Sequence, residues 1–182
     1  MGGRGSGSSG SSFGFNFGHE GRGGEERNKN LFPAYANVRI KTKTLESAME
    51  EFRNRYKNAD HEWAYVVDEQ GYVHEYVEGQ RSSVGVKKNE KGLMILHNHP
   101  SGSAFSGTDL MSAANGKYKG VVASGKHYDY VFQKNSTFKK EAFTEAIQNA
   151  KMSGNDYSEA VHKWLTKNQR KYGYKYHRSK ND

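Results

Sequence analysis

One short segment, residues 93–110, constrains the fold more than any other part of the chain. Its sequence is LMILHNHPSGSAFSGTDL, an apolar run followed by polar and turn-forming residues. The run from Leu93 to Leu96 is short and does not alternate, which is typical of a strand covered on both faces. Ser106 is a candidate N-cap for a short helix that closes near Gly116. The segment therefore predicts a buried strand, a loop and a helix.

The flanking sequence supplies the other elements of a sheet covered by helices. Apolar residues at helical spacing predict three further helices, over residues 44–56, 138–150 and 157–165. β-rich runs around short turns predict two hairpins, over residues 62–79 and 118–134. The predicted order is α-β-β-β-α-β-β-α-α. We therefore expect an α/β or α+β sandwich around a mixed sheet.

Composition divides the chain into a linker and one domain. Residues 1–30 contain ten glycines and five serines, and such a segment buries too little apolar surface to offset its ordering entropy. We predict a flexible linker there, and a linker that opens a chain usually tethers it to something larger, such as a phage or bacterial polypeptide. At 182 residues with 34% apolar content, the chain has room for one core, which we assign to residues 31–165.

The sequence contains no cysteine and no run of apolar residues long enough for a membrane span or a secretory signal. Without thiolates, any bound metal must be held by histidine, carboxylate and water. These features predict a soluble protein in a reducing compartment, with a cytoplasmic location and no membrane partner.

The positive charge is concentrated at the C-terminal end. The whole chain carries +8, and residues 163–182 alone have seven Lys and Arg against one acidic residue, or +6. We interpret residues 166–182 as a basic tail rich in tyrosine and lysine. Such a tail could follow a phosphate backbone and stack on bases, so nucleic acid is a candidate partner. We favour the simpler interpretation, a solubilising end of a terminal helix.

Two histidines at the end of the predicted strand suggest a metal site. If the strand continues past His97, alternation places His97 and His99 on one side and Asn98 on the other. A hydrolytic zinc site needs three protein ligands and an open position for water. Asp109 is the natural third ligand, because it lies in the first turn of the helix capped by Ser106 and a short loop could fold that turn back.

Hydrolysis would also need a carboxylate that takes a proton from the attacking water. Zinc lowers the pKa of a bound water to about 7, and a nearby carboxylate can then accept its proton. Four glutamates in the first predicted hairpin could lie across the sheet from the histidines: Glu62, Glu69, Glu75 and Glu78. Composition and spacing do not show which of these four glutamates would accept the proton.

The segment HNHPSGSAFSGTD, residues 97–109, resembles the JAMM motif (also called JAB or MPN+) of zinc metalloproteases. That motif has His-x-His-Pro, a short loop, a serine and, three residues later, an aspartate. The form HNHPSG is most similar to the bacterial and phage-type branches, including RadC-like proteins, rather than to eukaryotic deubiquitinases with His-Thr-His-Pro. Five residues separate Pro100 from Ser106, where many members have six. The similarity covers about residues 40–135.

The resemblance implies a fold and a set of site residues. The fold would be JAB/MPN-like (cytidine deaminase-like), a mixed β-sheet sandwiched by helices. His97, His99 and Asp109 match the ligands of one zinc ion per chain. Ser106 matches the residue that polarises the scissile carbonyl and stabilises the oxyanion. Glu62, in the run DHEWAYVVD, occupies the place of the general base.

The activity implied by the resemblance is that of a zinc metallopeptidase. It would hydrolyse a peptide or isopeptide bond with a metal-activated water and Glu62 as the base, and Glu75 is our second choice for that role. The substrate would be a protein or peptide. Ubiquitin-like tags are the best-known substrates, and an ordinary protein, a peptide or a cell-wall fragment stays open for a bacterial or phage-type member.

The sequence has two other interpretations. The alternative function is a weakly active or inactive JAB-fold binding module that acts on a protein or nucleic acid through its basic tail. An HNH nuclease is rejected, because the three residues in that name are dispersed over a ββα element and do not form a tripeptide. The remaining histidines are interpreted as structural: His19, His61, His74, His127, His162 and His177. The sequence does not decide the oligomeric state.

Overall fold

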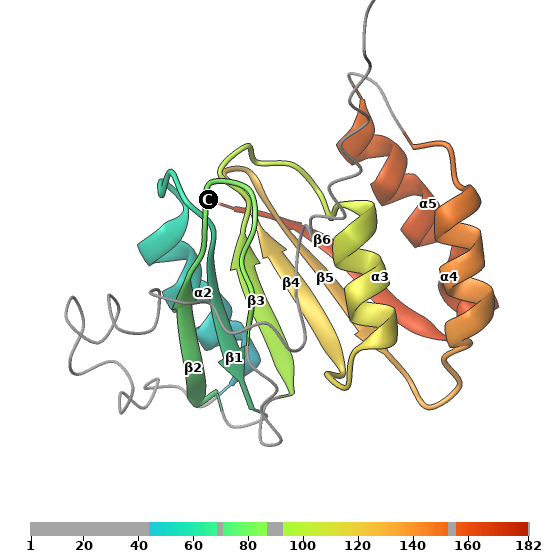
Figure 1. Ribbon diagram of the computed structural model, residues 1–182, viewed down its shortest axis with the longest axis horizontal. Helices are drawn as coiled ribbons and strands as arrows, with labels where there is room; N and C mark the ends of the chain where they lie inside the picture. The colour runs from blue at the N-terminus through green and yellow to red at the C-terminus, as the bar shows by residue number, and fades with distance from the viewer. Residues whose placement is uncertain (1–43, 69–70, 87–92, 153–155, 182) are drawn as a thin grey trace, which may run out of the picture.

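The protein has one mixed β-sheet with helices on both faces (Figure 1). The computed structural model describes residues 44–68, 71–86, 93–152 and 156–181. The strand order is β2-β1-β3-β4-β5-β6, in which β3 and β4 are parallel and the other neighbours are antiparallel. In chain order, the elements are α2 (Leu45–Tyr56), β1 (Trp63–Val67), β2 (Val73–Glu78), β3 (Met94–Asn98), α3 (Gly107–Asn115), β4 (Gly120–Ser124), β5 (Tyr128–Lys134), α4 (Lys140–Asn149), α5 (Tyr157–Tyr172) and β6 (Tyr174–Lys180).

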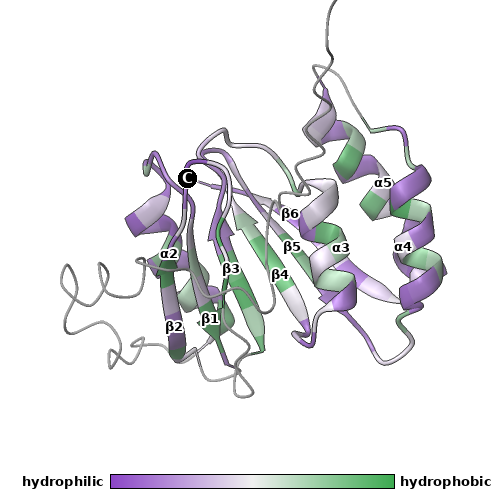
Figure 2. Cartoon of the chain, in the orientation of Figure 1, coloured by the Kyte–Doolittle hydropathy of each residue, from purple (hydrophilic) through white to green (hydrophobic). Residues whose placement is uncertain are grey.

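Two apolar clusters form the packed interfaces between the sheet and the helices on its two faces. On one face, Phe52 of α2 packs against Tyr65 of β1 with ring centroids 4.9 Å apart. On the other, Phe132 of β5 packs against Phe143 of α4 at 5.4 Å, in a cluster that also includes residues of α3 and α5. Figure 2 shows the apolar colour concentrated along the central strands between these helices. The predicted mixed sheet between helices is therefore confirmed.

The predicted elements up to α5 are present. The hydroxyl of Thr44 caps α2 by accepting a hydrogen bond from the Ser47 amide at 3.2 Å. Strand β3 is buried along its whole length, and β1–β2 and β4–β5 pair as the two predicted hairpins. The predicted linker over residues 1–30 and the predicted start of the domain at residue 31 lie outside the described residues. Glu69, one of the four candidate glutamates, also lies outside them.

The C-terminal residues are not a tail, and the boundary placed at residue 165 is wrong. Helix α5 continues to Tyr172, and Gly173 ends it with a left-handed backbone (φ 76°). Strand β6 then pairs with β5 along seven residues. Tyr174 and Tyr176 point into the core, and the Tyr174 hydroxyl donates a hydrogen bond to the Leu165 carbonyl at 2.7 Å. The alternation of Tyr with Lys and His is that of a sheet strand with one buried face.

A buried polar cluster supports the end of β3. The Asp129 carboxylate accepts a hydrogen bond from the Ser124 hydroxyl at 2.6 Å and pairs with Arg53 of α2 at 3.1 Å. Arg53 also donates to the Asn181 side chain at 3.0 Å. The Ser124 carbonyl accepts a hydrogen bond from the His99 amide at 3.0 Å. This cluster therefore holds α2, β5 and the residue after β6 beneath the loop that begins at His99.

Candidate metal centre

His97 and His99 present the same ring nitrogen to each other at the end of β3. Nδ1 of His97 donates to the Val122 carbonyl at 2.8 Å, and Nδ1 of His99 donates to the Ser103 carbonyl at 3.0 Å. Because a carbonyl only accepts, both Nδ1 atoms carry protons, and each Nε2 atom offers a lone pair when its ring is neutral. The two Nε2 atoms are 2.9 Å apart. Two facing lone pairs this close require a shared proton or a cation between them.

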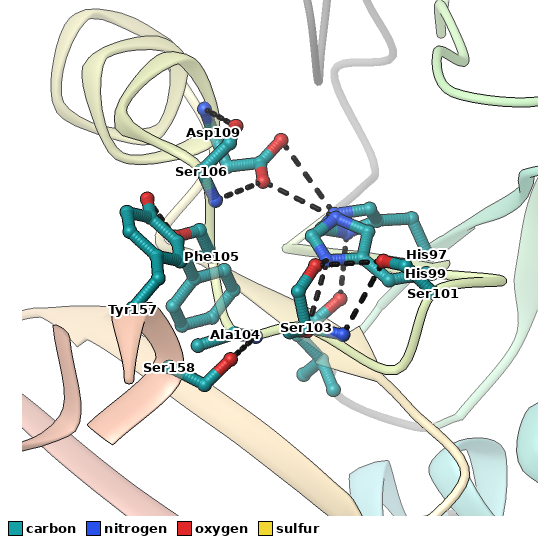
Figure 3. Close-up of polar contacts among 11 residues, drawn as sticks. His97, His99, Ser101, Ser103, Ala104, Phe105, Ser106, Asp109, Tyr157 and Ser158 are labelled. Atoms are coloured by element: carbon teal, nitrogen blue, oxygen red, sulfur yellow. Dashed lines mark hydrogen bonds and ion pairs between the residues drawn. The ribbon is translucent and has the colours of Figure 1, made fainter. Parts of the chain in front are cut away.

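Asp109 completes this group from the first turn of α3 (Figure 3). One carboxylate oxygen, Oδ2, is 3.3 Å from His99 Nε2 and accepts a hydrogen bond from the Ser106 amide at 2.7 Å. The other, Oδ1, is 3.6 Å from His97 Nε2 and is buried without a hydrogen-bond partner among the described residues. All the candidate ligand atoms lie within 4.8 Å of one another. The orphaned oxygen and the paired nitrogens fit a bound metal ion.

The charges of the group depend on one another. Burial lowers the pKa of His97. Burial also works against protonation of His99, but the carboxylates of Asp109 and Glu62 outweigh it and raise the pKa of His99 to about 9. The two imidazoles hold the pKa of Asp109 far below its usual range in spite of its burial. The carboxylate is therefore ionised, and a positive charge beside it is favoured, either a proton on His99 or a metal ion.

Glu62 lies just before β1 and faces the same space as this group. It lines a cavity of about 180 Å³ together with His99, Ser106 and Asp109. Its side chain is 6% exposed, and burial raises its pKa to about 7. Its Oε2 atom is buried and has no hydrogen-bond partner among the described residues. A carboxyl group that titrates near neutral pH can both accept and donate a proton.

The other candidate glutamates are placed elsewhere or lie outside the described residues. Glu75 and Glu78 belong to β2, and neither lines the cavity that contains Glu62. Glu75 pairs with Val66 of β1, whereas His97 pairs with Ala64, two residues earlier in that strand. Glu69 is outside the described residues. Among the described candidates, Glu62 is therefore the one beside the candidate metal-binding group.

Ser106 has a structural role that leaves its hydroxyl proton available. Its Oγ accepts a hydrogen bond from the Asp109 amide at 3.0 Å, and the Asp109 carboxylate accepts one from the Ser106 amide, which makes a capping box. The predicted N-cap is thus confirmed. A hydroxyl that accepts in this way can still donate. Because Ser106 also lines the cavity, its O–H can reach a group bound there.

The loop between the histidines and Ser106 is fastened to α5, which the sequence did not indicate. The Tyr157 hydroxyl donates to the Phe105 carbonyl at 2.9 Å, and the Ser158 hydroxyl accepts from the Ala104 amide at 3.0 Å (Figure 3). These partners are about 50 residues away in the chain, and neither residue type signals such a contact. The five-residue loop between Pro100 and Ser106 is held by these contacts and by the capping box.

A second, larger cleft adjoins the cavity. Its volume is about 780 Å³, and it shares Glu62, Ser82 and Ser101 with the smaller cavity. Its walls come from the segments before β1 and after β2, the loop after β3 and the turn after β4. A chain bound in this cleft would therefore reach Glu62 and the metal-binding group.

The other described histidines are not part of this group. His61 is hydrogen-bonded to Asp60, His74 to Asp68 and His162 to the Tyr176 hydroxyl. The side chains of His127 and His177 are exposed. His19 lies outside the described residues.

Glu62 makes the metal-free protein less stable as the pH rises. Because its pKa is 4.5 ordinarily and about 7 in the folded protein, its contribution to stability is full below about pH 4.5 and is lost as the pH rises through 7. Glu62→Gln stays neutral, so we expect it to exceed the wild type in unfolding free energy by up to about 3 kcal/mol near pH 8. Near pH 4 the difference should vanish. Urea unfolding at both pH values measures this, and an equal difference at the two values would contradict the raised pKa.

Comparisons with known proteins add no further assignment. A scan against protein-family models and searches of curated proteins and of solved structures found no match. Among the described residues, no helix combines the length and the apolar character needed to cross a membrane.

Proposed function

We propose that the protein is a zinc-dependent metallopeptidase that hydrolyses a peptide or isopeptide bond. The observation that carries this proposal is that Glu62 lines one cavity with His99 and Asp109, which form a buried group with His97. The resemblance of residues 97–109 to the JAMM motif, and the JAB/MPN-like fold that it implies, support the same function. The mixed sheet between helices is consistent with that fold.

Zinc is the metal that we propose for His97, His99 and Asp109. Two imidazole nitrogens and a carboxylate form a ligand set that zinc uses in hydrolytic sites, where a fourth position stays open. Calcium and magnesium prefer sites built of oxygen ligands, which this group is not. When bound, zinc would supply a water of lowered pKa and polarise the substrate carbonyl.

Glu62 carries the proton in the proposed reaction. In its ionised form it accepts a proton from the attacking water, and in its protonated form it delivers that proton to the leaving amine. In the metal-free protein, burial raises its pKa to about 7, and a bound cation would lower that pKa and favour the ionised form that accepts the proton. Its Oε2 atom is buried and has no hydrogen-bond partner among the described residues, so this atom is free of a competing hydrogen bond from them.

Ser106 and the adjoining cleft would bind the substrate. The Ser106 hydroxyl proton can be donated to the carbonyl oxygen as negative charge develops on it. The cleft of about 780 Å³ is large enough for several residues of a chain. We therefore propose a protein or peptide as the substrate, with ubiquitin-like conjugates among the candidates.

Hydrolysis that depends on a metal tests this proposal. The full chain, purified and loaded with one equivalent of zinc, is incubated with a peptide library and with a set of isopeptide-linked reporters. New amino termini, or released tags, should be detected by mass spectrometry and should be lost after chelation and restored by added zinc. Cleavage that is unaffected by chelation would contradict the proposal.

The binding-module alternative has less support. Its basic tail is part of α5 and β6, so removing residues 166–182 would take away a strand of the sheet together with the charge. A binding module also has no need of a buried carboxyl group with a raised pKa in a cavity with metal ligands.

A further inference from the structure

Asn98 lies between the two histidines and has no part in the reaction proposed above. Its side chain is 1% exposed. Strand alternation turns it away from the imidazoles and toward the α2 side of the sheet. A buried amide is costly unless its donors and acceptor are paired. The partners of Asn98 therefore show what it holds.

Those partners lie on both sides of Glu62. The Asn98 Oδ1 atom accepts a hydrogen bond from the Trp63 amide at 2.6 Å. Its Nδ2 atom donates to the His61 carbonyl at 3.0 Å and to the carbonyl of Tyr56, the last residue of α2, at 3.3 Å. One side chain thus binds the residue before Glu62, the residue after it and the end of the preceding helix.

The Asn98 side chain extends the pairing of β3 with β1 beyond their last backbone pair. The ladder between β1 and β3 ends at the pair Ala64 and His97, and the bond from Asn98 to the Trp63 amide continues it by one residue. On the other side, the Glu62 amide donates to the Gln80 carbonyl at 2.8 Å. The backbone of Glu62 is therefore held directly by the segment after β2, and Asn98 of β3 holds the residues on either side of Glu62.

We propose that Asn98 is a positioning residue that fixes the Glu62 carboxyl group relative to the histidine pair. This inference rests on the proposed function and deepens it. Because Asn98 lies between His97 and His99 in the chain, its hydrogen bonds tie the Glu62 segment to the end of β3 that carries the histidines. Proton transfer is sensitive to such placement, and a shift of about 1 Å can cost about 100-fold in rate.

Two variants of the full chain test the proposal, with one control. Asn98→Ala removes all three hydrogen bonds. Asn98→Asp keeps the acceptor for the Trp63 amide and removes both donated bonds. Tyr174→Phe is the control, because it also removes a buried hydrogen bond, the one to Leu165, but far from Glu62. The readouts are hydrogen exchange at the Trp63 amide, zinc affinity by titration, and kcat and KM on a cleaved peptide.

For Asn98→Ala we expect faster exchange at Trp63 and a fall in kcat of about 10- to 100-fold, with KM and zinc affinity nearly unchanged. Asn98→Asp should keep the protection at Trp63 and lose less kcat. Tyr174→Phe should change neither exchange at Trp63 nor kcat. If Asn98→Ala does not fold, Asn98→Asp carries the comparison through its kcat at unchanged zinc affinity.

Unchanged exchange at Trp63 in Asn98→Ala would overturn the proposal. So would a zinc affinity that falls in parallel with kcat, because Asn98 would then only support the metal-binding group. A wild-type protein that binds zinc but cleaves no amide bond contradicts the proposed function alone. Hydrogen exchange at the Trp63 amide and zinc affinity can be measured without a substrate. In that case, these two measurements decide whether Asn98 holds the Glu62 segment independently of the metal-binding residues.

Discussion

His97→Ala is expected to abolish stoichiometric zinc binding and, with it, hydrolysis. The imidazole of His97 is fully buried, and its Nε2 faces both His99 and Asp109. Removing an outer partner of a metal ligand commonly costs about 10- to 100-fold in metal affinity, so removal of a ligand itself should cost more than about 100-fold. Metal analysis of the purified protein and zinc titration measure the loss.

His127→Ala is the matched control for this variant. It removes the same side chain from an exposed position after β4, so its zinc content should equal that of the wild type. Circular dichroism of both variants checks that the sheet is retained. Wild-type protein that binds no zinc, or a His97→Ala protein that binds it fully, would show that these residues are not the zinc site.

Glu62→Gln is expected to lose about 100- to 10,000-fold in kcat while it keeps zinc. Glutamine has nearly the same shape but neither accepts a proton from water nor delivers one to an amine. Zinc should remain, because the group that can hold it consists of His97, His99 and Asp109. Steady-state kinetics with zinc-loaded protein, together with metal analysis of the same sample, separate the loss of the base from the loss of the metal.

Glu75→Gln is the control for the base. Glu75 is a half-buried glutamate of the same predicted hairpin as the buried Glu62, but it lies outside the cavity. Its substitution should leave kcat within about threefold, as expected for a residue that does not transfer the proton. Equal losses in the two variants would mean that the hairpin, rather than the Glu62 carboxyl group, is what activity requires.

Much of the candidate metal-binding group could be predicted because its geometry is local. Strand alternation places His97 and His99 on one side, and the cap at Ser106 puts Asp109 in the first helical turn. Both rules depend on a few neighbouring residues. Glu62 was harder to choose, because burial beside the histidines depends on how two strands pair. The resemblance to the JAMM motif is what points to Glu62 as the base, and in the structure Glu62 lines the cavity.

The parts that sequence reasoning missed are those set by distant contacts. Strand β6 was interpreted as a tail because Lys175 and Arg178 dominate its composition, although Tyr174 and Tyr176 alternate on the buried face. The contact of Tyr157 with the loop after β3 joins segments about 50 residues apart. Hydrogen bonds of this kind follow from the packing of α5 on the sheet, which no local pattern encodes.

All three proposed ligands come from one stretch of chain, residues 97–109. In polymer terms, an ion bound there closes a short loop. Closing a short loop removes little entropy from the unfolded chain, and each doubling of loop length adds only about 0.6 kcal/mol. Such an ion cross-links the end of β3 to the start of α3 and no other elements. Its loss would therefore loosen that junction and leave the rest of the sheet cooperative.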